Sequence, residues 1–289
     1  MRYIISLEKL NKNILIAQFL IGAKSLSLMF KEYYEEIYYQ LNNNYNSDIF
    51  GINIPESICY AIGRATHHNK GAVVNNLTDV ANLHFSGMRL FYIPIDTTDG
   101  REGMSVYEAS QLARNIHNFV DSSITIMGLV TNGCINNNHI KKQEDWYDIW
   151  SAFDGHLKGV SVGGSFWLNK HNILPEFVND VRIGRFMLFG IIPYSEDNIG
   201  QNCMTIEGNV LGVNLSNNKV IVDLGDAYCD PEQCKPNNDD FILSDISSNY
   251  ALYYTPKASM YYIGQRLLFT PSYQHSSALS KLNVRFDYE

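Results

Sequence analysis

Polar residues that could do chemistry directly follow several apolar runs of this sequence. The clearest case is Lys31, which comes immediately after the run SLSLMF at residues 25–30. A lysine amine that is kept neutral, by burial or by nearby cations, is a nucleophile. Lys31 is therefore a candidate reactive amine at the end of a predicted strand.

A second group of residues could bind a phosphate. The run VSVGGS ends in Gly163, Gly164 and Ser165, a turn of small residues whose backbone N–H groups and serine hydroxyl are suitable donors to an anion. Arg182 and Gly184 follow in the segment VRIGR. Taken singly, Gly-Gly-Ser is usually an ordinary turn and an arginine at a strand end usually faces water. The order of these features along the chain is what indicates a shared site.

Two further apolar runs end in polar groups. In IPIDTTDGREG, Asp96 follows a predicted strand and Arg101 lies a little further on. In GLVTNGC, Thr131 and Asn132 follow another predicted strand. Four runs thus deliver polar side chains to their C-terminal ends.

The elements that would position these residues alternate between strand and helix up to about residue 195. Ser105 and Glu108 form a capping-box sequence that predicts a helix over residues 105–120. Further helices are predicted over residues 141–153 and near the N-terminus, where Leu7, Leu10, Ile14, Ala17 and Ile21 recur at helical spacing. Strands are predicted at residues 25–30, 48–53, 71–76, 88–95, 123–130, 158–164 and 181–190.

This alternation indicates a parallel sheet closed into a (β/α)8-type barrel, in which catalytic groups lie at the C-terminal ends of the strands. After Tyr194 the pattern changes to period-two alternation with turn clusters and no amphipathic helix. We therefore predict an α/β chain with a barrel domain at residues 1–194 and an all-β domain at residues 195–289.

Composition limits the function. The 289 residues are 45% hydrophobic and 18% charged, as in a soluble globular protein, and the net charge of −8 with no basic cluster argues against nucleic acid or anionic membranes as partners. The longest apolar run is shorter than the roughly 20 residues that span a bilayer. Five scattered cysteines with no C-x-x-C pair predict reduced thiols in a cytoplasmic protein, without a metal site.

The order of the motifs resembles that of the fold-type III pyridoxal-phosphate-dependent amino acid racemases, the alanine racemase superfamily, and is closest to its ornithine or lysine racemase branch. The resemblance covers nearly the whole chain. It rests on ISLEKLNKNI, LMFK, IDTTDGREG, GLVTNG, VSVGGS, LPEFVNDVRIGR, VIVDLGD, SDISSNY and FTPSYQHSSAL. Ser6 stands where the family usually has Asp, the expected C-terminal tyrosine near Asn283 is missing, and the chain is shorter than typical members.

The resemblance implies pyridoxal 5′-phosphate as cofactor and gives each candidate a role. Lys31 would form the Schiff base and act as one acid/base group. Arg101 would hold the substrate carboxylate or the cofactor hydroxyl, and Asn132 would complete the cofactor's hydrogen bonds. The phosphate would be bound by Ser165 and the backbone around Gly164 and Gly184. Arg182 would face the pyridine nitrogen, which then stays unprotonated and makes the ring a weaker electron sink.

Racemisation needs a second base on the opposite face of the substrate. In alanine racemases this is a tyrosine from the partner subunit, so the resemblance implies a head-to-tail homodimer with composite sites. Tyr250, in SDISSNY, is the candidate, and Tyr273 is the reserve. The chain has 19 tyrosines, so a core or interface role competes with a catalytic role for either one.

Three functions remain open from the sequence. The first is a racemase that interconverts L- and D-amino acids with small or basic side chains, of the ornithine, lysine or alanine type. The second is a pyridoxal-phosphate-dependent decarboxylase on the same architecture. The third is a non-catalytic relative that binds the cofactor but has lost the second base.

Overall fold

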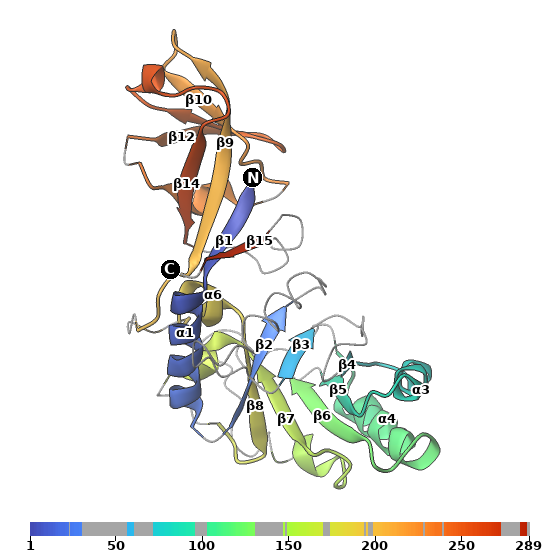
Figure 1. Cartoon of the computed structure of the whole chain (residues 1–289). Coiled ribbons are helices and arrows are strands. Elements are labelled where there is room, and N and C mark those ends of the chain that lie inside the picture. The colour runs from blue at the N-terminus through green and yellow to red at the C-terminus, as the bar shows by residue number, and fades with distance from the viewer. Residues whose placement is uncertain are drawn as a thin grey trace. The chain divides into compact units, whose positions relative to one another are not determined.

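Figure 1 shows the chain as a computed structural model. The structure describes residues 1–22, 24–30, 57–60, 72–95, 103–130, 147, 149–169, 174–193, 195, 199–227, 229–238, 240–272 and 284–287. Two compact units form the molecule. We call Ile14–Met187 with Ile191–Ile199 the parallel unit, and Met1–Asn13, Leu188–Gly190 and Gly200–Glu289 the antiparallel unit.

The parallel unit contains a seven-stranded, all-parallel sheet of order β3-β2-β8-β7-β6-β5-β4. Its strands are β2 (Ser25–Phe30), β3 (Ser57–Tyr60), β4 (Ala72–Val73), β5 (Leu90–Ile95), β6 (Thr125–Val130), β7 (Gly159–Gly163) and β8 (Val178–Ile183). Read as a ring, this order follows the chain, with the first strand β2 beside the last strand β8. Cα atoms of β3 and β4, at the two ends of the path, approach within 8 Å. The strand order is that of a barrel, and the closed eight-stranded barrel stays a prediction.

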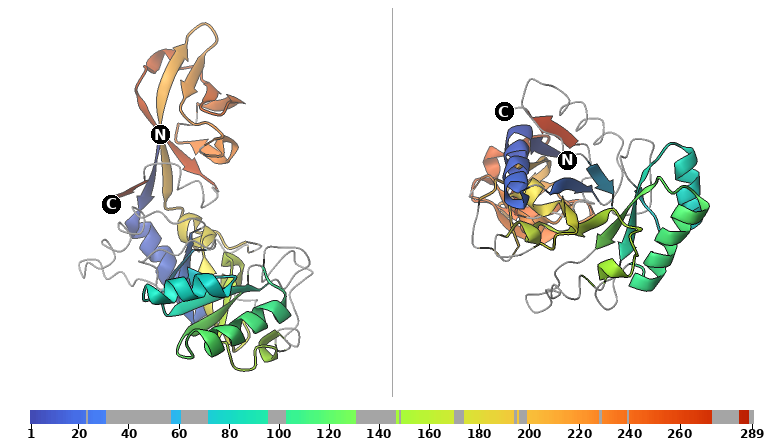
Figure 2. Two further views of the ribbon diagram at one scale, coloured as in Figure 1. Left: turned by 90° about the vertical axis from the view of Figure 1, so that its right-hand side faces the viewer. Right: turned by 90° about the horizontal axis from the view of Figure 1, so that it is seen from below.

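Among the described residues, the α-helices are α1 (Leu7–Ile21), α3 (Leu77–Phe85), α4 (Val106–Phe119) and α6 (Arg185–Phe189). The helix predicted over 105–120 is confirmed as α4, including its capping box. The five apolar residues predicted along one face of the first helix are all buried in α1. The helix α3 was not predicted; it packs beside α4 (Figure 2), and α4 in turn packs on β5.

The strand predicted over residues 181–190 is only partly right. β8 begins earlier, at Val178, and ends at Ile183, while residues 185–189 form α6. Both segments are buried almost throughout, so their apolar residues show no period that separates strand from helix. Gly184 lies at the junction. The strand predicted at 48–53 lies outside the described residues.

The two faces of the parallel sheet differ in polarity because successive side chains of a strand point to opposite faces. One face is apolar, with buried side chains of Ile93, Val130, Val160, Val162, Val181 and Ile183. The opposite face carries the small apolar cluster of Tyr92, Met127 and Leu129. Along β7 and β8 that same face carries Ser161, Asp180 and Arg182, all buried. Polar groups therefore concentrate on one face, at β7 and β8.

The antiparallel unit is built on an eight-stranded sheet with the path β11-β14-β9-β10-β13-β12. Its strands are β1 (Arg2–Ser6), β9 (Met204–Asn214), β10 (Lys219–Val222), β11 (Cys234–Pro236), β12 (Ile242–Ile246), β13 (Ala251–Tyr254), β14 (Arg266–Pro271) and β15 (Val284–Asp287). β1 pairs with β9 antiparallel and with β15 parallel. The N-terminal strand thus belongs to this sheet, which the sequence patterns did not indicate.

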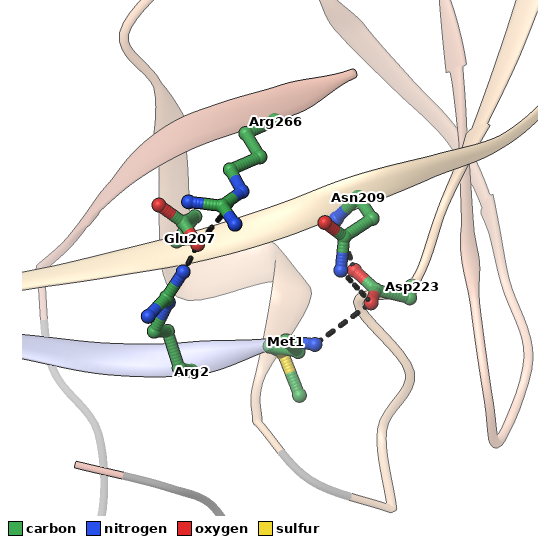
Figure 3. Close-up of polar contacts among 6 residues, drawn as sticks. All are labelled: Met1, Arg2, Glu207, Asn209, Asp223 and Arg266. Atoms are coloured by element: carbon green, nitrogen blue, oxygen red, sulfur yellow. Dashed lines mark hydrogen bonds and ion pairs between the residues drawn. The ribbon is translucent and has the colours of Figure 1, made fainter. Parts of the chain in front are cut away.

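Charged contacts fasten β1 to its neighbours (Figure 3). Arg2 Nε donates to Glu207 Oε1 at 2.6 Å, and Arg266 Nε lies 3.7 Å from the same oxygen. The amine of Met1 forms an ion pair with Asp223 Oδ2 at 2.8 Å, and Asn209 Nδ2 donates to that oxygen at 2.8 Å. Side chains from β1, β9 and β14 therefore hold this part of the sheet together.

Within the described part of the chain, we find no helix with the length and apolar character that crossing a membrane requires.

Candidate functional site

The predicted site residues fall into two groups. Lys31, Arg101 and Asn132 lie outside the described residues, as does the reserve base Tyr273. The described candidates in the parallel unit are Gly164, Ser165, Arg182 and Gly184, and all four lie at the C-terminal ends of the adjacent strands β7 and β8. In the sequence, Lys31 directly follows β2, which pairs with β8 on its other side.

The turn after β7 and the turn after β8 are joined by a serine hydroxyl. The backbone N–H of Phe186, in α6, donates to Ser165 Oγ at 2.8 Å, and Ser165 is 3% exposed. The backbone N–H of Gly164 donates to the carbonyl of Arg182 at 2.9 Å. A hydroxyl carries one hydrogen of its own, so Ser165 can accept from Phe186 and still donate to an anion.

Gly164 has a backbone conformation that favours glycine. Its φ is +106°, in the region that residues with a Cβ rarely adopt. A Cβ built on it would come no closer than 4.0 Å to its nearest neighbour, the backbone N of Phe166. The turn therefore requires glycine for its dihedral angle, while the space beside it stays open.

Arg182 is held in place by neighbouring strands. Its side chain is buried, and its Nη1 donates to the carbonyl of Ser161 at 2.6 Å and to Ser161 Oγ at 2.8 Å. Its Nη2 donates to the carbonyl of Val130, the last residue of β6, at 2.9 Å. The Ser161 hydroxyl in turn donates to the carboxylate of Asp180. We call Ser161, Asp180 and Arg182 the arginine cluster.

Sequence reasoning singled out Arg182 but not its two partners. Asp180 stands in an otherwise apolar strand, two positions before the arginine, and this spacing places both side chains on one face. That signal was available. Ser161 could not have been found in the same way, because its role depends on the register of β7 against β8.

Lys24 is the other lysine next to β2, and its position does not suit the cofactor-binding role predicted for Lys31. It precedes the strand, at the edge opposite to the candidate site. Its Nζ donates to the carbonyls of Pro175, at 3.1 Å, and Val178. Burial lowers the pKa of Lys24, but its amine is occupied by backbone carbonyls and acts as a structural anchor.

Tyr250 lies in the antiparallel unit, directly before β13. The residue is 37% exposed, and its backbone carbonyl accepts a hydrogen bond from the N–H of Ser247 at 2.8 Å. Tyr250 is thus exposed, and no acid or base partner of its phenol is found among the described residues. Its catalytic role stays a prediction.

Two searches on sequence alone give no relative, since no family model and no curated protein matches the chain. Solved structures do match. The chain is similar to alanine racemase from Clostridium difficile 630, with a TM-score of 0.65 and 10% identity over 100% of this chain and 96% of that one. It is similar to D-threo-3-hydroxyaspartate dehydratase from Delftia sp. HT23, with a TM-score of 0.57 and 14% identity over 99% and 94%.

A third match is D-threonine aldolase from Filomicrobium marinum, with a TM-score of 0.59 and 11% identity over 96% of this chain and 88% of that one. Similarity along nearly the whole length of three different enzymes establishes the architecture rather than one reaction. The chain has the fold of alanine racemase, and the resemblance drawn from its sequence motifs is confirmed at the level of the fold.

Proposed function

We propose that this chain is a pyridoxal-phosphate-dependent amino acid racemase. The observation that carries the proposal is the joined pair of strand ends at β7 and β8, where Ser165 and the buried Arg182 lie in a chain with the alanine racemase fold. In an open or closed parallel sheet this edge is where ligands bind.

The described residues fit the phosphate and ring of this cofactor. Ser165 has a hydroxyl hydrogen to donate, and Gly164 and Gly184 provide turns without side chains beside it. Arg182 is a guanidinium, which donates hydrogen bonds and accepts none, so it suits a ring nitrogen that carries no proton. These are the groups that would hold the cofactor's phosphate and its ring nitrogen.

When bound, pyridoxal phosphate supplies an electron sink that stabilises the negative charge left at Cα after proton removal. Lys31 would bind the cofactor through its amine and move a proton at one face of Cα. Arg101 would bind the substrate carboxylate or the cofactor hydroxyl, and Asn132 would complete the cofactor's hydrogen bonds. The partner subunit's Tyr250 would return or remove the proton at the other face, as general acid–base catalysis on both faces requires.

The proposal also assigns a role to each unit. The cofactor-binding domain, a closed (β/α)8-type barrel predicted at residues 1–194, would correspond to the parallel unit, and the β domain predicted at residues 195–289 to the antiparallel unit, which also contains Met1–Asn13. The protein would work in the cytoplasm as a head-to-tail homodimer, because the second base comes from the partner. The substrate would be a small or basic amino acid of the ornithine, lysine or alanine type.

The cofactor is tested by absorption spectroscopy on the purified protein after incubation with pyridoxal phosphate. We expect a visible band in the wild type that borohydride removes, and its absence in Lys31→Ala. Lys24→Ala is the matched control, since Lys24 flanks the same strand at its other end and should leave the band unchanged. A wild type that gains no band would refute the proposal.

The reaction is tested by incubating the cofactor-loaded protein with single L- and D-amino acids in deuterium oxide. A racemase forms the opposite enantiomer and exchanges the Cα hydrogen for deuterium on both faces. Release of carbon dioxide would identify a decarboxylase, while loss of water or cleavage of the Cα–Cβ bond would identify chemistry of the kind named for the dehydratase and the aldolase. A bound cofactor with no turnover of any amino acid would leave the non-catalytic relative.

A further inference from the structure

The arginine cluster contains two residues that have no role in the proposed reaction. Ser161, Asp180 and Arg182 are 0%, 2% and 1% exposed. Removing a carboxylate and a guanidinium from water carries a large desolvation cost, and apolar replacements of such groups are often as stable or more stable. Protein stability alone therefore explains poorly why a carboxylate is buried beside Arg182. A role in ligand binding explains it better.

Hydrogen-bond direction within the cluster is fixed by donor count. The hydroxyl of Ser161 has one hydrogen, and it donates that hydrogen to Asp180 Oδ2. It can then offer only lone pairs to Arg182, whose Nη1 donates to Ser161 Oγ at 2.8 Å. Asp180 accordingly determines which side of the hydroxyl faces the guanidinium.

Strand geometry makes this arrangement rigid. Asp180 and Arg182 lie two residues apart on β8 and share a face, and Ser161 lies opposite Asp180 in the β7 register. The carbonyls of Ser161 and Val130 accept from the two terminal nitrogens of Arg182, at 2.6 and 2.9 Å. β7, which pairs with β8, and β6, the next strand beyond it, thus fix the plane of the guanidinium, and the carboxylate of Asp180 balances its charge.

We propose that Asp180, acting through the hydroxyl of Ser161, is a positioning residue that fixes the guanidinium of Arg182 for its hydrogen bond to the ring nitrogen of pyridoxal phosphate. This inference rests on the proposed function, because it assumes that the cofactor binds beside Arg182. It adds two residues whose contribution is orientation and charge balance, since neither would touch the substrate.

The test uses the full-length protein without cofactor, titrated with pyridoxal phosphate, and compares Ser161→Ala, Asp180→Ala and the double variant with wild type. Each single variant should raise the dissociation constant about tenfold, the effect of about one charge-assisted hydrogen bond. It should also shift the visible absorption maximum of the bound cofactor, which responds to charge at the ring nitrogen. Ser110→Ala is the matched control, since Ser110 is a buried serine whose hydroxyl donates only to the carbonyl of Tyr107 in α4; it should change neither quantity.

The double variant tests whether Asp180 acts through Ser161. Residues that work in one chain of contacts are not additive, so the double variant should lose no more affinity than the weaker-binding single variant. A product of the two single effects, about a hundredfold, would overturn the inference, because each residue would then act independently. Single variants that bind as tightly as wild type with an unshifted band would overturn it as well.

Folding and the proposed function are controlled separately. If Asp180→Ala fails to fold, Asp180→Asn replaces it, since Asn keeps the shape and an acceptor oxygen without the charge. It should then weaken binding roughly threefold, because a neutral acceptor holds the Ser161 hydroxyl less strongly, and wild-type affinity would contradict the inference. A wild type that binds no pyridoxal phosphate refutes the proposed function itself, whereas normal wild-type binding with unaffected variants refutes only the role of Asp180.

Discussion

The two units place their buried charges in different positions relative to the sheet. Among the described residues, the buried charged side chains are Asp180 and Arg182 in the parallel unit and Glu207 in the antiparallel unit. The first two lie on β8, between its neighbours β2 and β7, whereas Glu207 holds the N-terminal strand to the sheet through Arg2. Removing the Glu207 side chain would weaken the attachment of β1 to β9, while removing the Arg182 side chain would take away a group that we propose binds the cofactor.

This difference separates charges that serve assembly from charges that serve binding. The ion pair between β1 and β9 recovers part of its desolvation cost by helping to hold a strand whose apolar residues are buried, such as Tyr3 and Ile5 of β1. In the arginine cluster, by contrast, two carbonyls and a hydroxyl converge on one guanidinium. Its charges are better explained by a ligand that needs an oriented guanidinium.

The largest expected effect is that of Arg182→Ala. Breaking a buried charge network by removing one partner costs about 3 to 5 kcal/mol of unfolding free energy, because Asp180 is left without its compensating charge. Affinity for pyridoxal phosphate should fall at the same time. Urea unfolding and cofactor titration measure the two effects. Arg266→Ala is the control, since Arg266 is an arginine with a 62% exposed side chain 3.7 Å from Glu207 and should cost about 0 to 1 kcal/mol.

Glu207→Ala should destabilise the antiparallel unit without affecting cofactor binding. The loss of a charged acceptor for Arg2, at 2.6 Å, should cost about 1.5 to 3 kcal/mol of unfolding free energy. Cofactor affinity should be unchanged, because on our proposal Glu207 belongs to strand assembly alone. Urea unfolding followed by titration with pyridoxal phosphate tests both statements. A tenfold loss of cofactor affinity would contradict the separation of the two kinds of charge.

Two glycine substitutions should destabilise the two units for different reasons. Gly164→Ala places a Cβ in open space but forces alanine to a φ of +106°, which should cost about 1 to 3 kcal/mol through strain alone. Gly225→Ala, in the antiparallel unit, would place its Cβ 2.0 Å from the carbonyl oxygen of Ser248, so the cost of about 1 to 3 kcal/mol comes from backbone displacement. Only Gly164→Ala should weaken phosphate binding, measured with inorganic phosphate and with pyridoxal phosphate. Equal losses in both variants would show that stability, rather than the turn, controls binding.

Local sequence signals predicted the elements that depend on local interactions. The strand at residues 25–30 has the predicted limits as β2, and the capping box of Ser105 and Glu108 begins α4 as expected. Such signals need only neighbouring residues. The pairing of β1 with β9 and β15 depends on partners roughly two hundred or more positions away and left no trace in the local pattern.

The candidate site divides in the same manner. Arg182 and Ser165 could be identified because they follow apolar runs and match a known order of motifs. Ser161 could not, since its contacts with Asp180 and Arg182 depend on β7 lying beside β8 in a particular register. The strand pattern shows that Asp180 and Arg182 share a face, but it does not show which residue donates a hydrogen bond to which partner.

The smallest expected effect lies outside both buried clusters, at the capping box of α4. The hydroxyl of Ser105 donates to Glu108 Oε2 at 2.8 Å and its backbone N–H donates to the same oxygen at 3.0 Å, and these bonds lower the pKa of the Glu108 carboxyl from its usual 4.5. A pKa lowered in the folded state stabilises that state above the unfolded pKa, and the contribution is lost as pH falls through the folded pKa.

Ser105→Ala should therefore lower the unfolding free energy by about 1 kcal/mol at pH 7, the usual cost of losing an N-terminal cap. The stability advantage of wild type over Glu108→Gln should be present at pH 7 and shrink below pH 4.5. Urea unfolding of both proteins across that pH range measures it. In the Ser105→Ala background, Glu108→Gln should show a much smaller pH dependence, because the hydroxyl that lowers the pKa most is gone. An advantage that grows on acidification would contradict the hydrogen-bond origin of the shift, since only a carboxyl with a raised pKa behaves in that direction.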